Sequence, residues 1–338
     1  MATSQIMELA QTIVRDKPCL AAFLLAVGSF SALRVLYQTL SVFLQTLVLP
    51  GASLKKFGAK KGAWAVVTGA TNGIGKEFAI QLGKAGFNIL LIARNQGLLT
   101  AAANEIGEKY NVQTLTHSID FAAAGDKEYD ALADVFRGLD IGVLVNNVGK
   151  SHNMPVYLVD TPLDEMRDIV QINVNATLRV TYFALPAMIQ KKRGLILNIG
   201  SFSGAVPSAM LATYSGTKAF LSTFSSALGE EVKKDGIVVE HVNTYFVVSN
   251  LSKIRKPSLF IPTPSVYVRS VLSKIGLACG ASFSGRPNTS TPFWPHALID
   301  YAMTLVGVPS LFISYTHNLH KDIRRRALRK IERESKAQ

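Results

Sequence analysis

The sequence predicts an α/β fold built on a doubly wound parallel sheet, with a membrane anchor before it and a basic tail after it. Between residues 62 and 243, short apolar runs alternate with segments of helical periodicity. Such alternation indicates a parallel sheet that is covered by helices on both faces. Residues 19–40 are apolar over about the length that crosses a bilayer, which about 20 helical residues can do.

The first 50 residues are predicted to form a polar segment followed by a transmembrane anchor. Residues 1–17 are polar and mixed in charge, whereas the stretch from Cys19 is almost wholly apolar. Arg34 interrupts it, but its long side chain can reach a membrane interface. A cleavable signal peptide and an amphipathic helix lying on the membrane surface are the alternatives.

A basic linker at residues 51–61 sets the predicted orientation of the anchor. Before the anchor, two acids offset two cations, whereas the linker carries four lysines and no acid: Lys55, Lys56, Lys60 and Lys61. Positive charge beside a transmembrane helix favours the cytosolic side. We therefore expect a single-pass protein whose main domain faces the cytosol.

We assign residues 62–280 to one α/β domain. Apolar runs predict strands near 63–68, 88–93, 112–118, 141–146, 194–199 and 237–243. Helical periodicity predicts helices near 74–84, 96–109, 126–137, 163–192 and 213–234. Right-handed crossovers then give the strand order 3-2-1-4-5-6, the Rossmann-type arrangement.

A glycine-rich turn between the first strand and the first helix predicts a dinucleotide site. Gly69, Gly73 and Gly75 let the backbone approach a pyrophosphate, and the helix that follows presents its N-terminal N–H groups. We count the residues between the glycines among the expected cofactor contacts: Thr71, Asn72 and Ile74.

The end of the second predicted strand favours NADPH over NADH. An acid at this point would bind the ribose 2′-hydroxyl of NAD. Here the residue is Arg94, a cation that suits a 2′-phosphate. The alternative is an arginine that simply lies on the surface.

The pentad Tyr214-Ser-Gly-Thr-Lys218 is the candidate centre of the chemistry. Positions four apart share one helix face, so the phenol and the ammonium can converge. A nearby cation lowers the pKa of a phenol, and such a Tyr can exchange a proton with an alcohol oxygen while another group moves a hydride. Taken alone, the pentad also fits an ordinary helix.

Four motifs in order resemble the short-chain dehydrogenase/reductase family over roughly residues 62–250. They are the glycine turn, Asn146-Asn147-Val148-Gly149, Ser201 after a strand, and the pentad at Tyr214. The resemblance implies that Ser201 steadies the substrate oxygen, Tyr214 transfers the proton and Lys218 supports both the Tyr and the cofactor ribose. It also implies a proton relay through Asn173, with Asn175 as the alternative.

The same resemblance extends the cofactor site. Asp120 matches an acid that contacts adenine, and Asn147 belongs to a turn that steadies sheet and cofactor. Val247 and Ser249 match residues that line the nicotinamide. The family often has Pro-Gly after the sixth strand, where this chain has Thr244 and Tyr245.

Within the family, Tyr245-Phe-Val247, Ser252-Lys-Ile-Arg-Lys256 and Asn146-Asn-Val-Gly-Lys-Ser-His152 resemble very-long-chain 3-oxoacyl-CoA reductases, including the fungal ones, and their 17β-hydroxysteroid dehydrogenase relatives. This implies NADPH-dependent reduction of 3-oxoacyl-CoA to 3-hydroxyacyl-CoA during fatty acid elongation at the endoplasmic reticulum membrane. The implied partners are the long-chain acyl-CoA, membrane lipid and other elongation enzymes. A steroid ketone reductase and an anchored, non-catalytic scaffold are the alternatives.

Cations after the last strand are expected to meet the phosphates of coenzyme A. They are Lys253, Arg255 and Lys256. A steroid has no phosphate for these side chains to bind, so this charge favours the CoA ester as substrate.

Residues 281–338 combine an apolar segment with a basic tail. Residues 264–275 before them look helical, and 280–295 read as a loop with room for a short last strand. The apolar stretch 297–315 fits a membrane-dipping or substrate-covering segment, a second span or plain core. From Leu319 to Gln338 there are eight Lys or Arg and three acids, which predicts either contact with anionic lipid or a solvated helix face.

Other site types find little support in the sequence. No nucleic-acid recognition module accompanies the basic run. His317 and His320 are close in sequence but have no third ligand nearby, so no metal site is predicted. Cys19 and Cys279 offer no disulfide framework.

Overall fold

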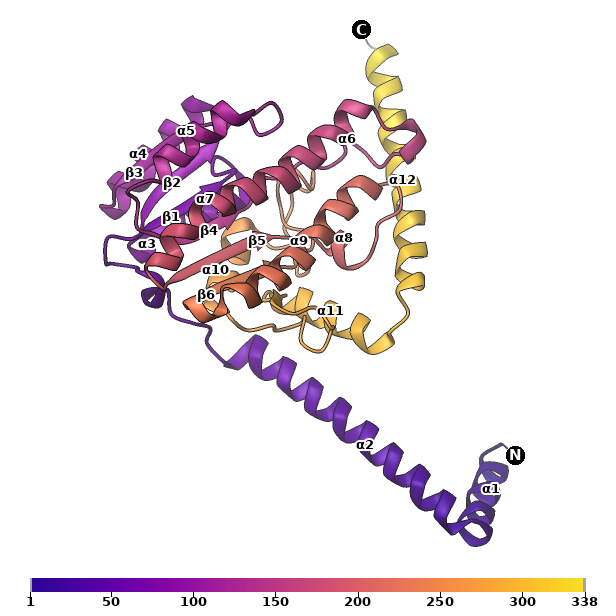
Figure 1. Ribbon diagram of the computed structural model, residues 1–338. Helices are drawn as coiled ribbons and strands as arrows, with labels where there is room; N and C mark the ends of the chain where they lie inside the picture. Colours follow the sequence, from indigo (N-terminus) through magenta and orange to yellow (C-terminus); the bar gives the residue numbers. More distant parts are fainter. Residues whose placement is uncertain (1, 337–338) are drawn as a thin grey trace.

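Seven parallel strands form the centre of the structure, a computed structural model that describes residues 2–336 (Figure 1). Their bounds are β1 Trp64–Thr68, β2 Asn88–Ala93, β3 Thr114–Ser118, β4 Ile141–Asn146, β5 Gly194–Ile199, β6 Ile237–Val242 and β7 Thr289–Ser290. The order across the sheet is β3-β2-β1-β4-β5-β6-β7, and neighbouring strands run parallel. The predicted doubly wound sheet is confirmed, with one further strand at its edge.

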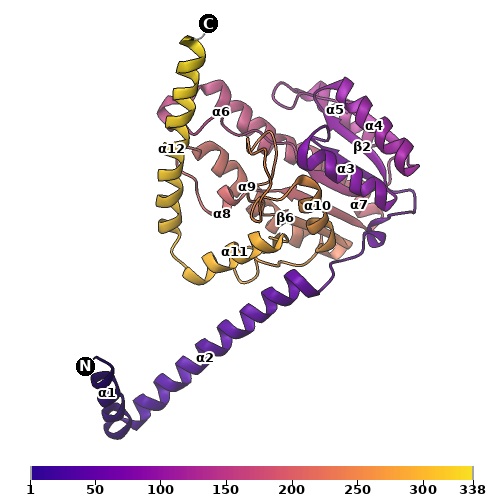
Figure 2. The same ribbon diagram turned by 180° about the vertical axis from the view of Figure 1, so that it is seen from behind.

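Helices cover both faces of this sheet, as the views from front and back show (Figures 1 and 2). One face carries α3 Gly73–Ala85, α4 Gln96–Tyr110 and α10 Pro264–Ser273. The other carries α5 Asp126–Phe136, α7 Ala176–Gln190 and α9 Ala212–Glu231. Strand side chains alternate between the two cores: Ala65 and Val67 of β1 join the first, and Val66 joins the second. All three are fully buried, so the sheet is dry on both faces.

The predicted helix 163–192 is interrupted. The structure divides it into α6 Leu163–Val170, a π-helical turn at Gln171–Asn175 and α7. Single π-turns inside α-helices are rare and occur often at functional sites. This one contains the buried Asn173, whose side chain bonds to segments outside the helix.

The N-terminal chain leaves the domain as a long helix. After α1 Ala2–Asp16, α2 Pro18–Phe43 continues through a π-turn to Val48. Within residues 2–336, Pro18–Val48 is the one helix long and apolar enough to cross a membrane, and it extends beyond the predicted span 19–40. The C-terminal turns of this helix are fixed to the domain, because Gln45 Oε1 accepts hydrogen bonds from the Cys279 N–H at 3.1 Å and the Ser282 hydroxyl at 3.2 Å.

The apolar stretch 297–315 does not form one helix. α11 Trp294–Val306 ends at Gly307, whose φ is +64°, and α12 Pro309–Lys336 follows. One face of α11 is buried, including Tyr301, while Leu298 and Leu305 are exposed. The Tyr301 hydroxyl lies 2.8 Å from the Thr39 hydroxyl of α2, so α11 contacts the base of the anchor. A second membrane span in this stretch finds no support in the described chain.

The sheet continues past the predicted domain boundary at residue 280. Thr289 and Ser290 of β7 pair with β6. Asp300 of α11 then binds this edge: its carboxylate accepts from Arg286 Nη2 at 2.6 Å and from Asn243 Nδ2 at 3.0 Å. The acid inside the apolar segment therefore holds α11 on the sheet.

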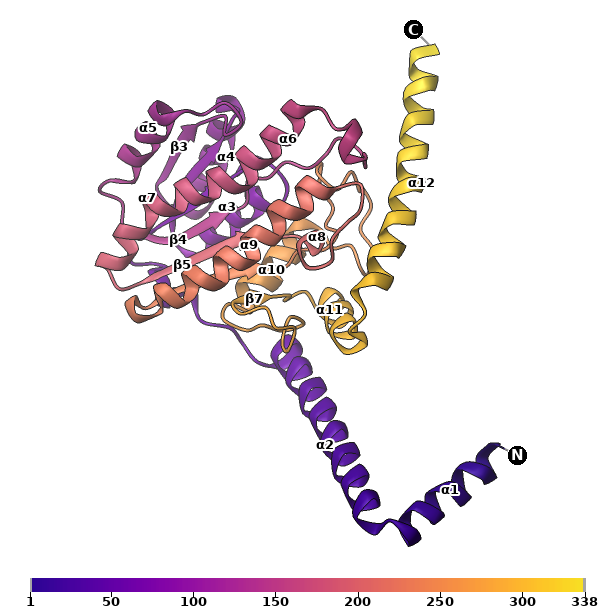
Figure 3. The same ribbon diagram turned by 45° about the vertical axis from the view of Figure 1, so that its right-hand side comes forward.

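α12 lies along the outside of the domain beside α6 and the short α8 Phe202–Ala205 (Figure 3). In Figures 1 to 3 its C-terminal end and α1 are at opposite ends of the molecule. The middle of α12, at His320 and Arg324, contacts the domain, whereas residues 328–336 are exposed and directed away from α2 (Figures 1 and 3). An exposed basic end fits the solvated helix face that the sequence allows, and a contact with lipid stays a prediction.

Glu240 of β6 makes folding sensitive to pH. Burial raises its pKa to about 7, although a hydrogen bond from the Gly276 N–H and the nearby Ser290 hydroxyl oppose the rise. The folded state binds the Glu240 proton more tightly than the unfolded chain does. The contribution of Glu240 to the free energy of unfolding is therefore fully present below the ordinary Glu pKa and is lost as pH rises through about 7.

We expect Glu240→Gln to remove this pH dependence, because the amide carries no charge to bury. Relative to the wild type, the variant should gain up to about 3 kcal/mol of unfolding free energy between about pH 5 and about pH 8. Thermal or denaturant unfolding of the detergent-solubilised protein across this range measures the difference. Parallel stability curves would show that Glu240 does not titrate with folding.

Candidate active site

The carboxyl end of β5 meets the first turns of α9, and the loop after β4 lies beside them. Tyr214 and Lys218 lie on one face of that helix and are buried, with 8% and 4% of their surfaces exposed. Lys218 Nζ donates a hydrogen bond to the Ile199 carbonyl at the end of β5, at 2.8 Å. It is 5.8 Å from the centroid of the Tyr214 ring. The phenol and the ammonium thus share a dry site at the sheet edge.

Ser201 faces this pair from the start of α8. It caps that helix, because its Oγ accepts from the Ser203 N–H at 3.2 Å. The Ser201 side chain also hydrogen-bonds to the Tyr214 phenol. The structure therefore brings together Ser201, Tyr214 and Lys218 as the sequence predicts, from the end of β5 and one helix face.

The electrostatics of the pair differ from the expectation in one respect. Burial raises the pKa of Tyr214, and the hydrogen bond to Ser201 only opposes this rise. Burial also lowers the pKa of Lys218 to about 8. The sequence predicts a Tyr whose pKa is lowered by the lysine. The Lys218 ammonium instead donates to a backbone carbonyl and lies 5.8 Å from the centre of the Tyr214 ring. Burial therefore has the larger effect on the pKa of Tyr214, and the phenol stays protonated at neutral pH.

Asn173 connects the π-turn to the loop after β4 and to α9. Its Oδ1 accepts from the Lys150 N–H at 2.8 Å, and its Nδ2 donates to the Lys150 carbonyl and the Thr217 hydroxyl at 2.9 Å each. A Cβ placed on Gly149 would lie 3.5 Å from Asn173 Oδ1 and 3.6 Å from Lys218 Nζ. Both side chains therefore border one small space. Asn175, the alternative, is exposed and bonds within its own turn to Gln171.

The glycine turn forms a tight cradle before α3. Gly69 and Gly73 have φ values of +67° and +55°, which favour glycine. A Cβ on Gly75 would lie 2.2 Å from the Gly69 carbonyl oxygen, so only glycine fits. Asn72 caps the helix, its Oδ1 accepting from the Gly73 N–H at 2.7 Å. Exposed backbone beside a helix N-terminus suits a phosphate, and these residues fit a dinucleotide.

The remaining first-turn residues and the strand ends complete the cradle. Thr71 and Ile74 are half-buried beside the glycines. Asn147 Nδ2 donates to the Thr68 and Gly69 carbonyls at 3.0 and 3.3 Å, which fixes the turn to β1 and β4. The Asn147 side chain is thus a support of the cradle.

Arg94 and Asp120 lie together at the carboxyl ends of β2 and β3. The guanidinium is 78% exposed and 3.7 Å from the Asp120 carboxylate. An exposed ion pair of this length contributes little, so it leaves the guanidinium open to another anion. The Asp120 carboxylate also accepts from the Ala122 N–H at 3.1 Å, which holds its loop.

The chain after β6 closes over the glycine turn. Val247 is buried, and its carbonyl accepts from the Ser252 hydroxyl at 2.7 Å. Ser249 Cβ would be 3.8 Å from a Cβ on Gly73. Ser249 thus adjoins the cradle, and Val247 is held close to it in the chain by Ser252.

An aromatic stack occupies the position where the family often has Pro-Gly. The Tyr245 ring lies 4.4 Å from Phe202 of α8 and 5.0 Å from His296 of α11, both stacked. Thr244 hydrogen-bonds to the Tyr267 hydroxyl at 2.8 Å. The sequence identifies Tyr245 only as a departure, because its partners are far away in the chain. Its bulk joins α8 and α11 beside Ser201.

The loop after β4 forms a wall of the site. His152 is buried, and its Nδ1 lies 2.7 Å from Glu165 Oε1. The Val156 N–H donates to the Met210 carbonyl at 2.8 Å. Lys253 donates to the Asn153 carbonyl and is therefore engaged in holding this wall. Arg255 and Lys256 beyond it are exposed. Within the described residues, no cluster of His, Cys, Asp or Glu is arranged to hold a metal ion.

Residues 63–258 match the family model described as short chain dehydrogenase. The chain belongs to this family, and it is accordingly an oxidoreductase that acts on a CH–OH/C=O group with a nicotinamide cofactor. The family and the fold predicted from the sequence are thereby confirmed.

Curated relatives match over nearly the whole chain. The very-long-chain 3-oxoacyl-CoA reductase of Coprinopsis cinerea is 78% identical over 99% of this chain and 98% of its own length. The protein of the same name from Laccaria bicolor is 69% identical over 100% of both chains. The similarity thus includes the N-terminal helix and α12.

Solved structures share the fold at lower identity. A 7β-hydroxysteroid dehydrogenase has a TM-score of 0.66 at 22% identity and covers 78% of this chain and 99% of its own. An actinorhodin polyketide ketoreductase with NADPH has a TM-score of 0.58 at 27% identity, covering 69% and 95%. These matches support the sheet and the helices that cover it.

Proposed function

We propose that this chain reduces very-long-chain 3-oxoacyl-CoA to 3-hydroxyacyl-CoA with NADPH, a step of fatty acid elongation at the endoplasmic reticulum. The observation that carries the proposal is the near-complete match to reductases of that name in a chain with an intact Ser201, Tyr214 and Lys218 site. An inert scaffold would have no need of this buried arrangement.

Tyr214 is the proton donor of the reaction. Bound nicotinamide supplies a hydride to the carbonyl carbon of the substrate. The Tyr214 phenol, kept protonated by burial, gives its proton to the carbonyl oxygen as charge develops there. The Ser201 hydroxyl steadies the same oxygen.

Lys218 and Asn173 serve the return of the proton. Below about pH 8 the Lys218 ammonium is charged, and it supports the phenolate left after proton transfer and the cofactor ribose. Asn173 borders the same space beside Gly149 and accepts and donates at once. This position suits a relay that carries a proton from solvent near the Lys150 loop to Lys218 and on to the Tyr214 phenolate.

The cofactor is NADPH, held along the carboxyl edge of the sheet. The turn of Gly69, Thr71, Asn72, Gly73, Ile74 and Gly75, which Asn147 supports, would hold the pyrophosphate. Arg94 binds the 2′-phosphate, and Asp120 contacts adenine. Val247 and Ser249 line the nicotinamide.

We expect Arg94→Asp to change the cofactor preference from NADPH toward NADH. The carboxylate repels the 2′-phosphate and accepts from a ribose hydroxyl, so the ratio of kcat/KM for the two cofactors should fall at least about tenfold, or ~1.4 kcal/mol. The control is Arg137→Asp, the same charge change at an exposed position after α5. An unchanged ratio would show that Arg94 does not read the phosphate.

The membrane concentrates the substrate. We assign residues 1–50 to a polar segment and single-pass anchor, 51–61 to a basic cytosolic linker, 62–280 to the reductase domain and 281–338 to an apolar and basic extension, which also adds β7 to the edge of the sheet. α11 and the start of α12 lie at the end of the domain that α2 enters (Figure 1), and Leu298, Leu305 and Leu311 of these helices are exposed. They offer an apolar path for the acyl chain beside the bilayer, where other elongation enzymes would supply and take up the thioester.

A substrate series tests the proposal. The full chain in detergent is assayed for NADPH oxidation with 3-oxoacyl-CoA esters of increasing chain length and with a steroid ketone. We expect turnover to rise with chain length and to exceed that of the steroid. Faster turnover of the steroid would favour the alternative activity, and no turnover of any ketone would favour the scaffold.

A further inference from the structure

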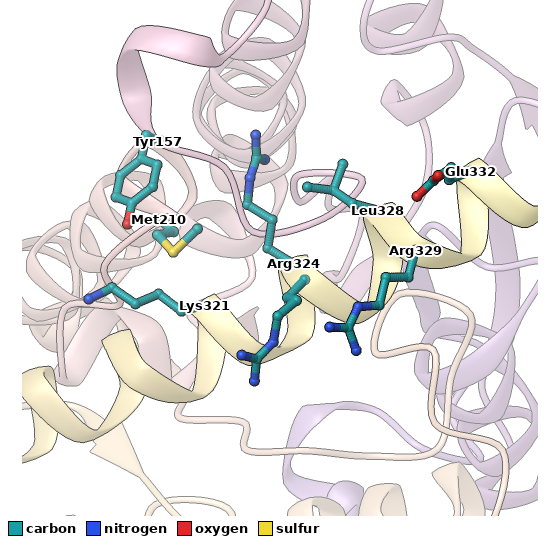
Figure 4. A pocket seen from close by; sticks show the side chains of 8 residues that line it. Tyr157, Met210, Lys321, Arg324, Leu328, Arg329 and Glu332 are labelled. Carbon is teal, nitrogen blue, oxygen red and sulfur yellow. The ribbon is translucent and has the colours of Figure 1, made fainter.

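A cationic groove lies between α12 and the wall of the site (Figure 4). Its volume is about 340 Å³. Tyr157 and Met210 form one side, and α12 contributes four cations: Lys321, Arg324, Arg325 and Arg329. The proposed reaction assigns no role to these side chains.

Specific contacts fix α12 at this position. Arg324 Nη1 donates to the Pro155 carbonyl at 3.0 Å, and its Nη2 is 3.7 Å from Asp160. His320 is buried, with Nδ1 2.7 Å from the Ala209 carbonyl. The groove is therefore a built feature of the fold.

The groove keeps unsatisfied positive charge. Arg325 pairs with Asp322 at 2.7 Å, and Glu332 on the groove pairs with Lys336 at 2.6 Å. Among the ion pairs of the described residues, none involves Lys321 or Arg329. The Arg325–Asp322 pair is mostly exposed, so it is weak and can yield to a polyanion. Arginine forks and an ammonium together match phosphate oxygens.

The groove adjoins the reaction centre. Met210 lies two residues before α9, and its carbonyl accepts from the Val156 N–H of the wall. The next turn carries Tyr214, and the Ser215 hydroxyl accepts from the Ser208 N–H at 3.0 Å. Met210, which lines the groove, is thus four residues before the catalytic Tyr214 in the chain.

The position of the groove favours a soluble polyanion over lipid headgroups. The cationic half of α12 points away from α1 and α2, while its apolar first half, with Leu311, lies near α11 and the anchor (Figures 1 and 3). A molecule with an apolar chain at one end and phosphates at the other would follow this gradient. The exposed Leu328 and the ring of Tyr157 add apolar surface for a flat base.

We propose that this groove binds the phosphorylated nucleotide end of the acyl-CoA substrate, an inference that rests on the proposed function. The cations bind the phosphates while the thioester reaches past Met210 toward Tyr214. This site differs from the expected one at Lys253, Arg255 and Lys256, of which Lys253 is engaged with the Asn153 carbonyl.

The test combines a groove variant with two thioesters. The variant Lys321→Ser/Arg325→Ser/Arg329→Ser leaves Arg324 in place, because that residue holds the wall. With the full chain in neutral detergent, KM for a long 3-oxoacyl-CoA should rise at least about tenfold, with kcat changed less than about twofold. KM for the N-acetylcysteamine thioester of the same acid, which lacks the phosphates, and KM for NADPH should stay unchanged.

A matched variant on the other side of α12 is the control. Arg326→Ser/Lys330→Ser/Arg333→Ser removes the same charge from the same helix but from residues outside the groove. Its KM values should equal those of the wild type. The proposal is overturned if both thioesters lose affinity equally, if the control variant has the same effect, or if the groove variant loses only binding to phosphatidylserine vesicles.

Failure of the proposed function is distinguishable. If wild-type protein reduced neither thioester, the assigned activity would be wrong. Titration of unacylated coenzyme A by calorimetry then still examines the groove. Weaker binding to the groove variant than to the control variant supports the headgroup site, and equal binding overturns it.

Discussion

Tyr214→Phe should lower kcat by about 10²–10⁴-fold while NADPH still binds. The substitution removes the phenolic hydroxyl that donates the proton and keeps the ring that fills the buried site. Lys218 remains tied to the Ile199 carbonyl, so the loss should concern the chemical step and leave the fold unchanged. Steady-state kinetics and NADPH fluorescence titration separate these two effects.

Tyr182→Phe is the matched control, since that residue is 74% exposed on α7. It should leave both kcat and NADPH affinity unchanged. If the Tyr214 variant kept more than about a tenth of the wild-type rate, an effect under ~1.4 kcal/mol, Tyr214 would not be the acid.

Gly75→Ala should weaken NADPH binding by about 100-fold, or ~2.7 kcal/mol. The new methyl group would lie 2.2 Å from the Gly69 carbonyl oxygen and 2.4 Å from Asn147 Nδ2. The turn must then move away from the helix N-terminus, which separates the backbone groups that hold the pyrophosphate. NADPH titration measures the loss, and unfolding experiments report any change in stability.

Gly97→Ala is the control for this substitution. A Cβ there meets only Asn95 Oδ1, at 3.5 Å, in ordinary contact. This variant should bind NADPH as the wild type does. Equal affinity of the Gly75 variant would mean that the glycine turn does not hold the cofactor.

The strands of the sheet and their order could be predicted from the local pattern of apolar residues. Runs such as those at 88–93 and 194–199 are apolar on both faces, as buried parallel strands require, and the structure has strands over the same residues. The break in the helix 163–192 was not accessible. It depends on Asn173 bonding to Lys150 and Thr217, which are distant in sequence.

Some features of the candidate site could likewise be predicted from the sequence, and others could not. Spacing puts Tyr214 and Lys218 on one helix face, but the direction of the Tyr214 pKa follows from burial that only the assembled fold supplies. Likewise the stack of Tyr245 joins elements about 40 to 50 residues away, Phe202 and His296. No local pattern could place it.

The placement of α12 could not be predicted from the sequence. Its basic run predicts either a contact with anionic lipid or a solvated helix face. The contacts of His320 with Ala209 and of Arg324 with Pro155 place the middle of this helix along the domain. These two bonds go to backbone carbonyls, which no side-chain pattern marks, and the one paired side chain, Asp160, is more than 160 residues away in the sequence.

Internal competition tests the central claim most directly. Full-length protein in detergent receives a long-chain 3-oxoacyl-CoA and a steroid ketone at equal concentration with limiting NADPH, and mass spectrometry quantifies both alcohols. The product ratio is the ratio of the two kcat/KM values. We predict that 3-hydroxyacyl-CoA accounts for nearly all NADPH consumed, and a predominance of hydroxysteroid would contradict the account.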